Sequence, residues 1–277
     1  MTVNDALILA KETLFSVPDR DVDAAWIVSA VTNIKRNALH FEKDKELTQK
    51  QVETLKYILQ RRKAREPLQY ILGFVPFYNL ILNTDKRALI PRDETALLVE
   101  TAINIINKKD YKTVLDIGTG SGAIAIAIKK NVPETLVTAS DISADALSLA
   151  KENACLNEVQ VDFIKSDLFE NLQNSKFDCI LSNPPYIAAK DMEKLEKELS
   201  FEPQNALDGG SDGLDFYRDI ISEVKNHLNK NGLLMFEIGF DQGDAVKTLL
   251  AKSGFVKSYV LKDYSALDRI VYTFYEG

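Results

Sequence analysis

The turn that follows residue 182 carries residue types that can bind a planar NH₂ group. It consists of Asn183, Pro184, Pro185 and Tyr186. The side-chain carbonyl of Asn183 and the main-chain carbonyl of Pro184 can accept the two hydrogens of an amide or an exocyclic amine. The prolines stiffen the turn, and Tyr186 offers an apolar face for stacking. We interpret these four residues as catalytic and substrate-binding; the alternative is a turn in which Asn183 caps its own backbone.

A glycine-rich segment predicts a second site, for a cofactor. Its residues are Asp116, Gly118, Thr119, Gly120, Ser121 and Gly122. The segment follows a predicted strand and opens a helix, where glycines let a ligand approach the backbone. Its Gly-x-Gly-x-Gly spacing after an acid differs from the Gly-x-Gly-x-x-Gly of dinucleotide enzymes. A carboxylate suits a cationic amino acid group better than it suits a pyrophosphate.

Two further acids extend this prediction. Asp141 closes the next strand, about twenty residues on, where an acid binds ribose hydroxyls. Asp167 follows the third strand and can accept from an adenine amine. Each acid alone is equally consistent with an N-cap or a turn. Together, Asp116, Asp141 and Asp167 favour S-adenosylmethionine, whose sulfonium and ammonium groups are positive, and Asn183 is also expected near its amino acid end.

The elements that must position these residues alternate between strand and helix. Apolar β-branched runs predict strands, and runs of helical periodicity separate them. This alternation indicates an α/β fold with a mostly parallel, doubly wound sheet, and the last two strands should pair antiparallel at its edge because no helix joins them. The predicted strands are residues 113–117, 136–140, 160–164, 177–181, 232–237, 255–261 and 269–275, and the predicted helices include 123–130, 144–157 and 244–252.

The first part of the chain has a different pattern. Helical periodicity runs from residue 2 to about residue 65, and Thr48 with Gln51 predicts a capping box. We predict a helical domain at 1–68, a linker hairpin at 69–92 and an α/β domain at 93–277 that holds both predicted sites and whose first helix has Asp93 as N-cap. The basic cluster formed by Arg61, Arg62, Lys63 and Arg65 is interpreted either as a helix C-terminus complementing its dipole or as a contact for an acidic or RNA-bound partner.

Composition narrows the class of protein. The net charge is −7: residues 1–85 carry 12 basic and 11 acidic side chains, and the remainder carries 22 and 30. A protein that grips a phosphate backbone is expected to have a basic face, so no direct nucleic-acid partner is expected. Two cysteines and two histidines predict no metal site. A polar start and the lack of long apolar runs predict a cytoplasmic protein without membrane contact, and we expect a monomer.

The whole chain resembles the bacterial protein-(glutamine-N5) methyltransferases that modify class I peptide chain release factors. The resemblance rests on the glycine-rich segment, on Asp141, on the turn at Asn183 and on flanking motifs. These flanking motifs are Arg61-Arg62, Glu66 to Ile71 with Gly73, Ile90-Pro91-Arg92, Glu94-Thr95, Glu202-Pro203, Ala206 to Gly210 and Asp212 to Leu214. The resemblance implies a Rossmann-like class I domain with a seven-stranded sheet and an antiparallel edge strand. It also implies methyl transfer from S-adenosylmethionine to the glutamine of a Gly-Gly-Gln tip.

Three positions depart from the family pattern. Asp93 stands where a second proline is usual, and Leu168 stands where an aromatic often covers the adenine of the cofactor. Ala266 replaces a usual glycine. Leu168 is nevertheless kept among the expected cofactor-binding residues.

Two other functions are compatible with parts of this pattern. The turn at Asn183 is shared with enzymes that methylate the amino group of adenine, which would require a base-flipping cleft and a basic footprint. A protein that binds a nucleotide-like ligand without chemistry is the other alternative, but such a protein has no use for an amide-binding turn.

Overall fold

The computed structural model describes residues 1–277, which form two compact units. The first unit comprises Met1–Gly73 and the segment Glu196–Phe201. The second comprises Phe74–Leu195 and Glu202–Gly277. The helical unit thus ends five residues beyond the boundary predicted at residue 68, and the hairpin groups with the sheet unit. No helix is both long enough and apolar enough to cross a membrane.

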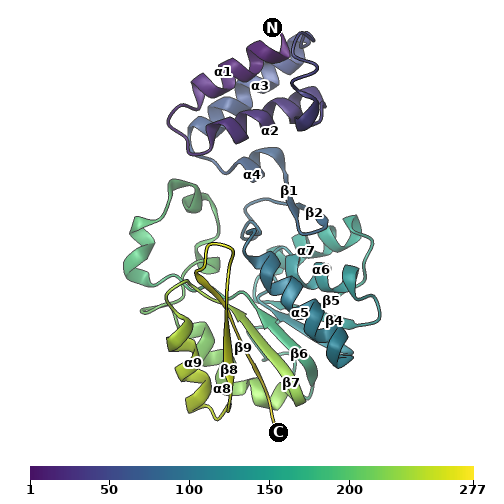
Figure 1. The fold of residues 1–277 in the computed structure, drawn as a ribbon, viewed down its shortest axis with the longest axis vertical. Coiled ribbons are helices and arrows are strands. Elements are labelled where there is room, and N and C mark those ends of the chain that lie inside the picture. The colour runs from purple at the N-terminus through teal and green to yellow at the C-terminus, as the bar shows by residue number, and fades with distance from the viewer. The chain divides into compact units, whose positions relative to one another are not determined.

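The first unit is helical, as its periodicity predicts. Its core is formed by the apolar faces of the first three helices, with Leu14, Ile27 and Leu55 fully buried. Thr48 and Gln51 form the predicted capping box. The elements are α1 (Val3–Thr13), α2 (Arg20–Thr32), η1 (Arg36–Ala38), α3 (Gln49–Lys63), α4 (Leu68–Leu72) and η3 (Lys197–Phe201) (Figure 1).

The basic cluster at the end of α3 is largely paired inside this unit. Arg62 is 6% exposed and donates to Asp23 at 2.7 Å and to Glu198 at 2.9 Å. Arg65 donates twice to Glu198, both times at 2.6 Å. Arg61 pairs with Glu66. Arg62 and Arg65 therefore hold the segment 196–201 against the end of α3. All three arginines have acidic partners within the unit and are not free cations for an acidic partner.

The second unit is built on a seven-stranded sheet in the order β5-β4-β3-β6-β7-β9-β8. All neighbouring strands are parallel except that β9 is antiparallel to both β7 and β8. The reversed strand therefore lies one place in from the edge, which β8 occupies. The strands are β3 (Thr113–Ile117), β4 (Leu136–Asp141), β5 (Asp162–Lys165), β6 (Phe177–Ser182), β7 (Leu228–Glu237), β8 (Ser258–Lys262) and β9 (Asp268–Phe274).

Helices cover both faces of the sheet, as expected for a doubly wound fold. One apolar cluster joins the first helices to one face, and a second joins the last two helices to the other face (Figure 1). On the first face lie α5 (Thr95–Lys109), α6 (Ala123–Asn131) and α7 (Ala144–Leu156). On the second face lie α8 (Asp215–His227) and α9 (Gly243–Lys252).

Two connections shape the carboxyl edge of the sheet. A hairpin of β1 (Phe74–Phe77) and β2 (Leu80–Asn83) leads into a strap, residues 84–94, ahead of α5. After β6, a long loop contains η2 (Ala189–Lys194), η3 and η4 (Gln204–Ala206). The prediction that Asp93 caps α5 is wrong: the N-cap residue is Glu94, and it makes no side-chain capping bond. The peptide before α5 folds as a turn, so Asp93 lies one residue too early.

Candidate active site

The site lies where the direction of sheet winding reverses. The chain runs outward from β3 to β4 and β5, and then returns to place β6 on the other side of β3. In open α/β sheets, ligands bind at the carboxyl ends of the strands that flank such a switch point. Here the two strand ends are joined by a buried hydrogen bond, in which Ser182 Oγ donates to the Ile117 carbonyl at 2.8 Å. A cavity of about 630 Å³ opens above these ends.

Most of the residues predicted to bind ligands line this one cavity. They come from the ends of β3, β4 and β5 and from the turn after β6. The lining residues that were predicted are Gly118, Thr119, Gly120, Ser121, Asp141, Asp167, Leu168, Asn183, Pro184 and Pro185. Asp116, Gly122 and Tyr186 are not among the lining residues. The expected cofactor residues and the expected acceptor residues are therefore neighbours in one space.

The glycine loop after β3 is braced from behind by Asp116. This carboxyl is fully buried; its Oδ2 accepts from the Thr119 hydroxyl at 2.6 Å and from the Ala125 amide at 3.2 Å. Its Oδ1 has no hydrogen-bond partner. Burial raises the pKa of Asp116 to about 7. In this structure, Asp116 shapes the loop from inside the protein instead of lining the cavity.

Two glycines of this loop have different tasks. Gly118 has φ +69°, and a Cβ at this position would meet no atom within 4 Å, so the backbone faces open space. Gly122 has φ +84°, and its Cβ would lie 2.8 Å from Ile126 Cδ1 and 3.1 Å from Ala150 Cβ. Gly118 therefore leaves room for a ligand, whereas Gly122 lets the start of α6 pack closely against α7.

Asp141 lies at the end of β4, between the loop and the cavity. Its Oδ2 accepts from the Gly120 amide at 2.9 Å, and its Oδ1 accepts from the Ser143 amide at 2.8 Å. Burial raises the pKa of Asp141, while these amides act to lower it. Each carboxylate oxygen can accept a second hydrogen bond, so Asp141 can bind hydroxyls from the cavity while it holds Gly120 in place.

The third acid lies on the far wall of the same cavity. Asp167 is exposed there, after β5. Leu168 beside it has φ +42°, a left-handed conformation that is costly for a branched side chain. Its side chain also packs partly against the second apolar cluster. Leu168 thus supplies an aliphatic surface at the position where an aromatic was noted as usual.

The turn at Asn183 is held by the backbone of residues 207–213. The amide of Ile187 donates to Leu207, and the amide of Gly209 donates back to Ile187 at 2.9 Å. A Cβ on Gly209 would lie 2.8 Å from the Pro185 carbonyl oxygen. Gln242 donates to the Tyr186 carbonyl at 3.0 Å. Close backbone approach on one side and a buried amide on the other therefore keep the turn rigid.

Tyr186 is half-buried against the second apolar cluster, where burial raises the pKa of its phenol. It does not line the cavity. The Asn183 side chain does, and its Nδ2 donates to Thr95 Oγ1 at 3.3 Å. The Asn183 amide group is therefore directed by a residue of α5.

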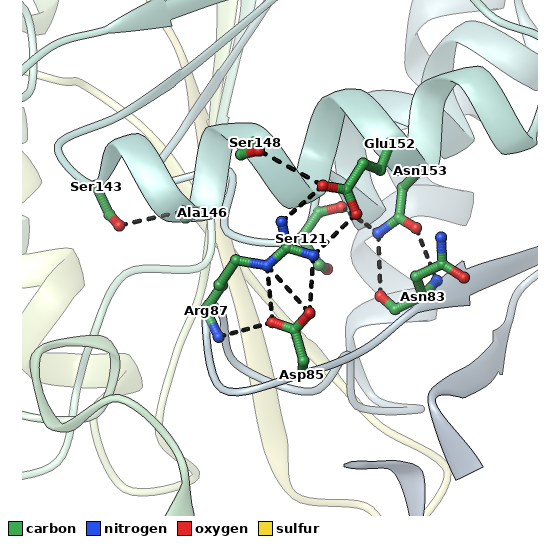
Figure 2. A network of polar contacts seen from close by, with 9 residues as sticks. All are labelled: Asn83, Asp85, Arg87, Ser121, Ser143, Ala146, Ser148, Glu152 and Asn153. Carbon is green, nitrogen blue, oxygen red and sulfur yellow. Dashed lines mark hydrogen bonds and ion pairs between the residues drawn. The ribbon is translucent and has the colours of Figure 1, made fainter. Parts of the chain in front are cut away.

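The strap after the hairpin lines one side of the cavity. Asn153 of α7 is fully buried, accepts from the Asn83 amide at 2.7 Å and donates to the Ser121 carbonyl at 3.0 Å. Arg87 pairs with Asp85 and with Glu152, each at 2.7 Å. Figure 2 shows these side chains side by side along α7. They fix the strap and the glycine loop to a single helix.

The other end of the strap is tied to the long loop after β6. Glu202 is 4% exposed and accepts from the Ile90 amide at 2.8 Å and from Arg92. Sequence reasoning included these residues only through the resemblance and did not give them a role. Asn153, Arg87 and Glu237 were not singled out at all. These three residues are distant in sequence from the glycine-rich segment and from the Asn183 turn. Only the structure shows that Asn153 and Glu237 are buried polar residues, which indicates a specific role for each.

Comparisons with known proteins agree with this arrangement. A family profile described as the methyltransferase small domain matches residues 93–212, and one described as the PrmC N-terminal domain matches residues 5–73. A methyltransferase structure from Pyrococcus furiosus shares the fold, with a TM-score of 0.53 and 19% identity over 83% of this chain and 100% of that chain.

Two relatives are similar over nearly the full length. The release factor glutamine methyltransferase of Geobacter sulfurreducens is 39% identical over 256 residues, which cover 92% of this chain and 89% of that protein. The release factor glutamine methyltransferase of Clostridium acetobutylicum is 37% identical over 278 residues, which cover 98% of each chain. These identities over nearly the full length of both proteins show that the chain belongs to the release factor glutamine methyltransferase family.

Proposed function

We propose that this protein transfers a methyl group from S-adenosylmethionine to the side-chain amide nitrogen of the glutamine in the Gly-Gly-Gln motif of class I peptide chain release factors. The observation that carries the proposal is that the Asn183 turn and the glycine loop line one cavity at the switch point of the sheet. One wall has groups suited to a cationic nucleoside, and the other has acceptors suited to an NH₂ group. Family membership supports both parts of the assignment.

The cavity residues fit S-adenosylmethionine. The open backbone at Gly118 can approach the amino acid end, Asp141 can accept ribose hydroxyls, and Asp167 can accept from the adenine amine. The unpaired Oδ1 of Asp116 adds a buried acceptor behind the loop, which favours positive charge in front of it. When bound, the cofactor supplies a methyl group on a positively charged sulfur, which is an electrophile.

The protein's own contribution is mainly to position the acceptor. An amide nitrogen is a poor nucleophile because its lone pair is shared with the carbonyl. If Asn183 Oδ1 and the Pro184 carbonyl accept its two hydrogens, the nitrogen is held with its lone pair directed at the methyl group. The same two acceptors stabilise the positive charge that the nitrogen gains on transfer. No general base is required, because the surplus proton can leave to water afterwards.

We assign substrate recognition to the helical unit. This unit matches the family profile described as the PrmC N-terminal domain. Exposed apolar side chains on this unit include Phe15, Phe41 and Tyr57, which are 68%, 86% and 61% exposed. Since most of the basic cluster on α3 is internally paired, contact with the release factor is expected to depend on these apolar side chains more than on Arg62 or Arg65.

A labelling experiment separates this function from methylation of adenine. Purified protein is incubated with methyl-labelled S-adenosylmethionine and either a class I release factor or adenine-containing single-stranded DNA. We expect label on the release factor and none on the DNA, because residues 86–277 carry 22 basic and 30 acidic side chains and a net negative charge disfavours a phosphate backbone. Label on the DNA, with retention that weakens steeply with salt, would instead support the adenine alternative.

A further inference from the structure

Glu237 is a buried acid beside the proposed acceptor site that the mechanism above does not use. It is the last residue of β7 and is 1% exposed. Its Oε2 has no hydrogen-bond partner. The register pairs Ser182 of β6 with Phe236 of β7, so Glu237 lies level with Asn183 at the carboxyl end of the sheet. A buried and unpaired carboxylate oxygen is costly, so its position next to Asn183 requires an explanation.

The groups near this carboxyl come from α5, from the turn after β6, from α8 and from β9. The Thr95 hydroxyl and the Asn183 amide lie near it, and both act to lower the pKa of Glu237, which favours its ionised form. The charged and titratable groups nearby are Glu94 at the start of α5, Tyr186 after β6, Tyr217 of α8 and Arg269 of β9. Tyr217 donates its hydroxyl to the main-chain carbonyl of Glu237 at 2.9 Å, and not to the carboxyl.

These contacts form a directed chain. Asn183 Nδ2 donates to Thr95 Oγ1 at 3.3 Å, so the hydroxyl hydrogen of Thr95 is available for the Glu237 carboxyl. A carboxylate only accepts hydrogen bonds, whereas an asparagine amide has one donating end and one accepting end. A carboxylate at this position therefore favours the orientation in which the NH₂ group of Asn183 points into the protein. The opposite orientation would place two acceptors together.

We propose that Glu237 is a positioning residue for methyl transfer: its carboxylate, acting on Asn183 directly and through Thr95, keeps Nδ2 of Asn183 inward and leaves Oδ1 free to accept from the substrate amide. This inference rests on the proposed function, because it assigns Oδ1 of Asn183 to the acceptor. This role accounts for a buried carboxylate beside the acceptor site.

Protonation of Glu237 should weaken its preference for the orientation in which Nδ2 of Asn183 points inward. Burial raises the pKa of Glu237 to about 7, although Thr95, Arg269 and Asn183 act to lower it. Below that pH the carboxyl gains an O–H donor, which can also satisfy the Asn183 amide in its reversed orientation. At saturating cofactor, kcat is therefore expected to fall as the pH drops through about 7.

The decisive variant is Glu237→Gln, which keeps the shape and can both donate and accept. We expect kcat to fall about tenfold or more, KM for the cofactor to stay within about twofold, and the decline of kcat below pH 7 to disappear. Thr95→Ser should retain the wild-type rate and pH profile, whereas Thr95→Val should resemble Glu237→Gln. Asp178→Asn is the matched control, since Asp178 accepts from Lys112 and Thr113 at the opposite end of the strands.

A second measurement does not depend on the substrate. In protein labelled with ¹⁵N at asparagine, the side-chain resonance of Asn183 should shift with a midpoint near pH 7, and this shift should be lost in Glu237→Gln. A release factor that stays unmethylated by wild-type protein would overturn the proposed function, and the resonance would still decide whether Glu237 orients Asn183. A resonance that does not titrate, or a Glu237→Gln variant with wild-type kcat and pH profile, would overturn the inference.

Discussion

One buried acid lies behind each of two rims of the cavity: the cofactor rim, formed by residues 118–121 and Asp141, and the acceptor rim, formed by residues 183–185 and Thr95. The two acids make different contacts. Asp116 is the next-to-last residue of β3 on the cofactor rim, and Glu237 is the last residue of β7 on the acceptor rim. Each has one oxygen without a partner and a pKa raised by burial to about 7. Asp116 bonds only within its own loop and helix, to Thr119 and Ala125. Glu237 instead faces side chains of two other elements.

This difference explains why the cofactor rim is built mainly from consecutive residues, whereas the acceptor rim is built from residues that are distant in sequence. The cofactor rim needs a fixed backbone shape, which a strand, a glycine loop and a helix start can provide among consecutive residues. The acceptor rim needs one amide group held in one orientation. That requires donors and acceptors from α5, β6 and β7, which only the tertiary fold brings together.

The largest effect is expected on the free energy of unfolding, and it concerns Asp116, the buried acid behind the cofactor rim. A pKa raised from 3.8 to about 7 means that the folded protein holds the proton more tightly, so the free energy of unfolding falls as the pH rises from about 4 to about 7. For Asp116 this amounts to roughly 4 kcal/mol at most. Urea unfolding at pH 5 and pH 8 should show a smaller loss in Asp116→Asn than in the wild type. An unchanged loss would mean that Asp116 is already ionised at pH 5.

The next effect separates the rims by kinetics. Asn183→Ala removes an acceptor that matters most as the substrate nitrogen becomes positive, so kcat should fall roughly a hundredfold or more. Cofactor affinity should change far less. Steady-state kinetics with a release factor and calorimetry with the cofactor provide the two readouts. Near wild-type turnover combined with a lower melting temperature would show that Asn183 is only a turn cap.

The reciprocal variant on the cofactor rim is Asp141→Ala. It should weaken cofactor binding by roughly tenfold, because it removes a charged acceptor and frees the Gly120 amide. At saturating cofactor, kcat should stay close to that of the wild type. Calorimetric titration checks the affinity, and Asp141→Asn should lose less because its amide oxygen can still accept. A large fall in kcat at saturation would contradict the separation of the two rims.

The smallest expected effect concerns how the cofactor rim is held (Figure 2). Asn153→Ala leaves buried groups of Asn83 and Ser121 without partners and should cost about 1 kcal/mol of stability. Arg87→Ala is the matched comparison, because its ion pair with Glu152 is partly exposed and should contribute less than about 1 kcal/mol. Thermal unfolding of both variants provides the test. If Arg87→Ala is less stable than Asn153→Ala, the ion pair of Arg87 contributes more to stability than the buried hydrogen bonds of Asn153, contrary to this expectation.

Much of the fold follows from local patterns in the sequence. The predicted strand at 113–117 coincides with β3, and the capping box at Thr48 is present. The last two strands pair antiparallel at the edge, as expected from their short connection. The predicted strands start too early where apolar residues precede the true start: β5 begins at Asp162 instead of residue 160, and β8 begins at Ser258 instead of residue 255.

The site was predictable where its residues are consecutive and was missed where they are not. The glycine loop and the Asn183 turn could be read as motifs, because each places several functional groups within a few residues. Asp116 follows the motif pattern, yet the structure places it behind the loop, since the side chain at a strand end can point to either face. Glu237 has no sequence signal beyond being an acid in an apolar run, and Asn153 has none, because it stands among other polar residues of a helix.

The central claim is that the substrate is the side-chain amide of one glutamine, and fragmentation mass spectrometry tests it most directly. A class I release factor is incubated with this protein and S-adenosylmethionine, digested and fragmented, alongside the same reaction with Asn183→Ala. We predict one added methyl group on the side-chain nitrogen of the glutamine in Gly-Gly-Gln, and strongly reduced modification with the variant. A methyl group on any other residue, or an unmodified glutamine after complete incubation, would contradict the account.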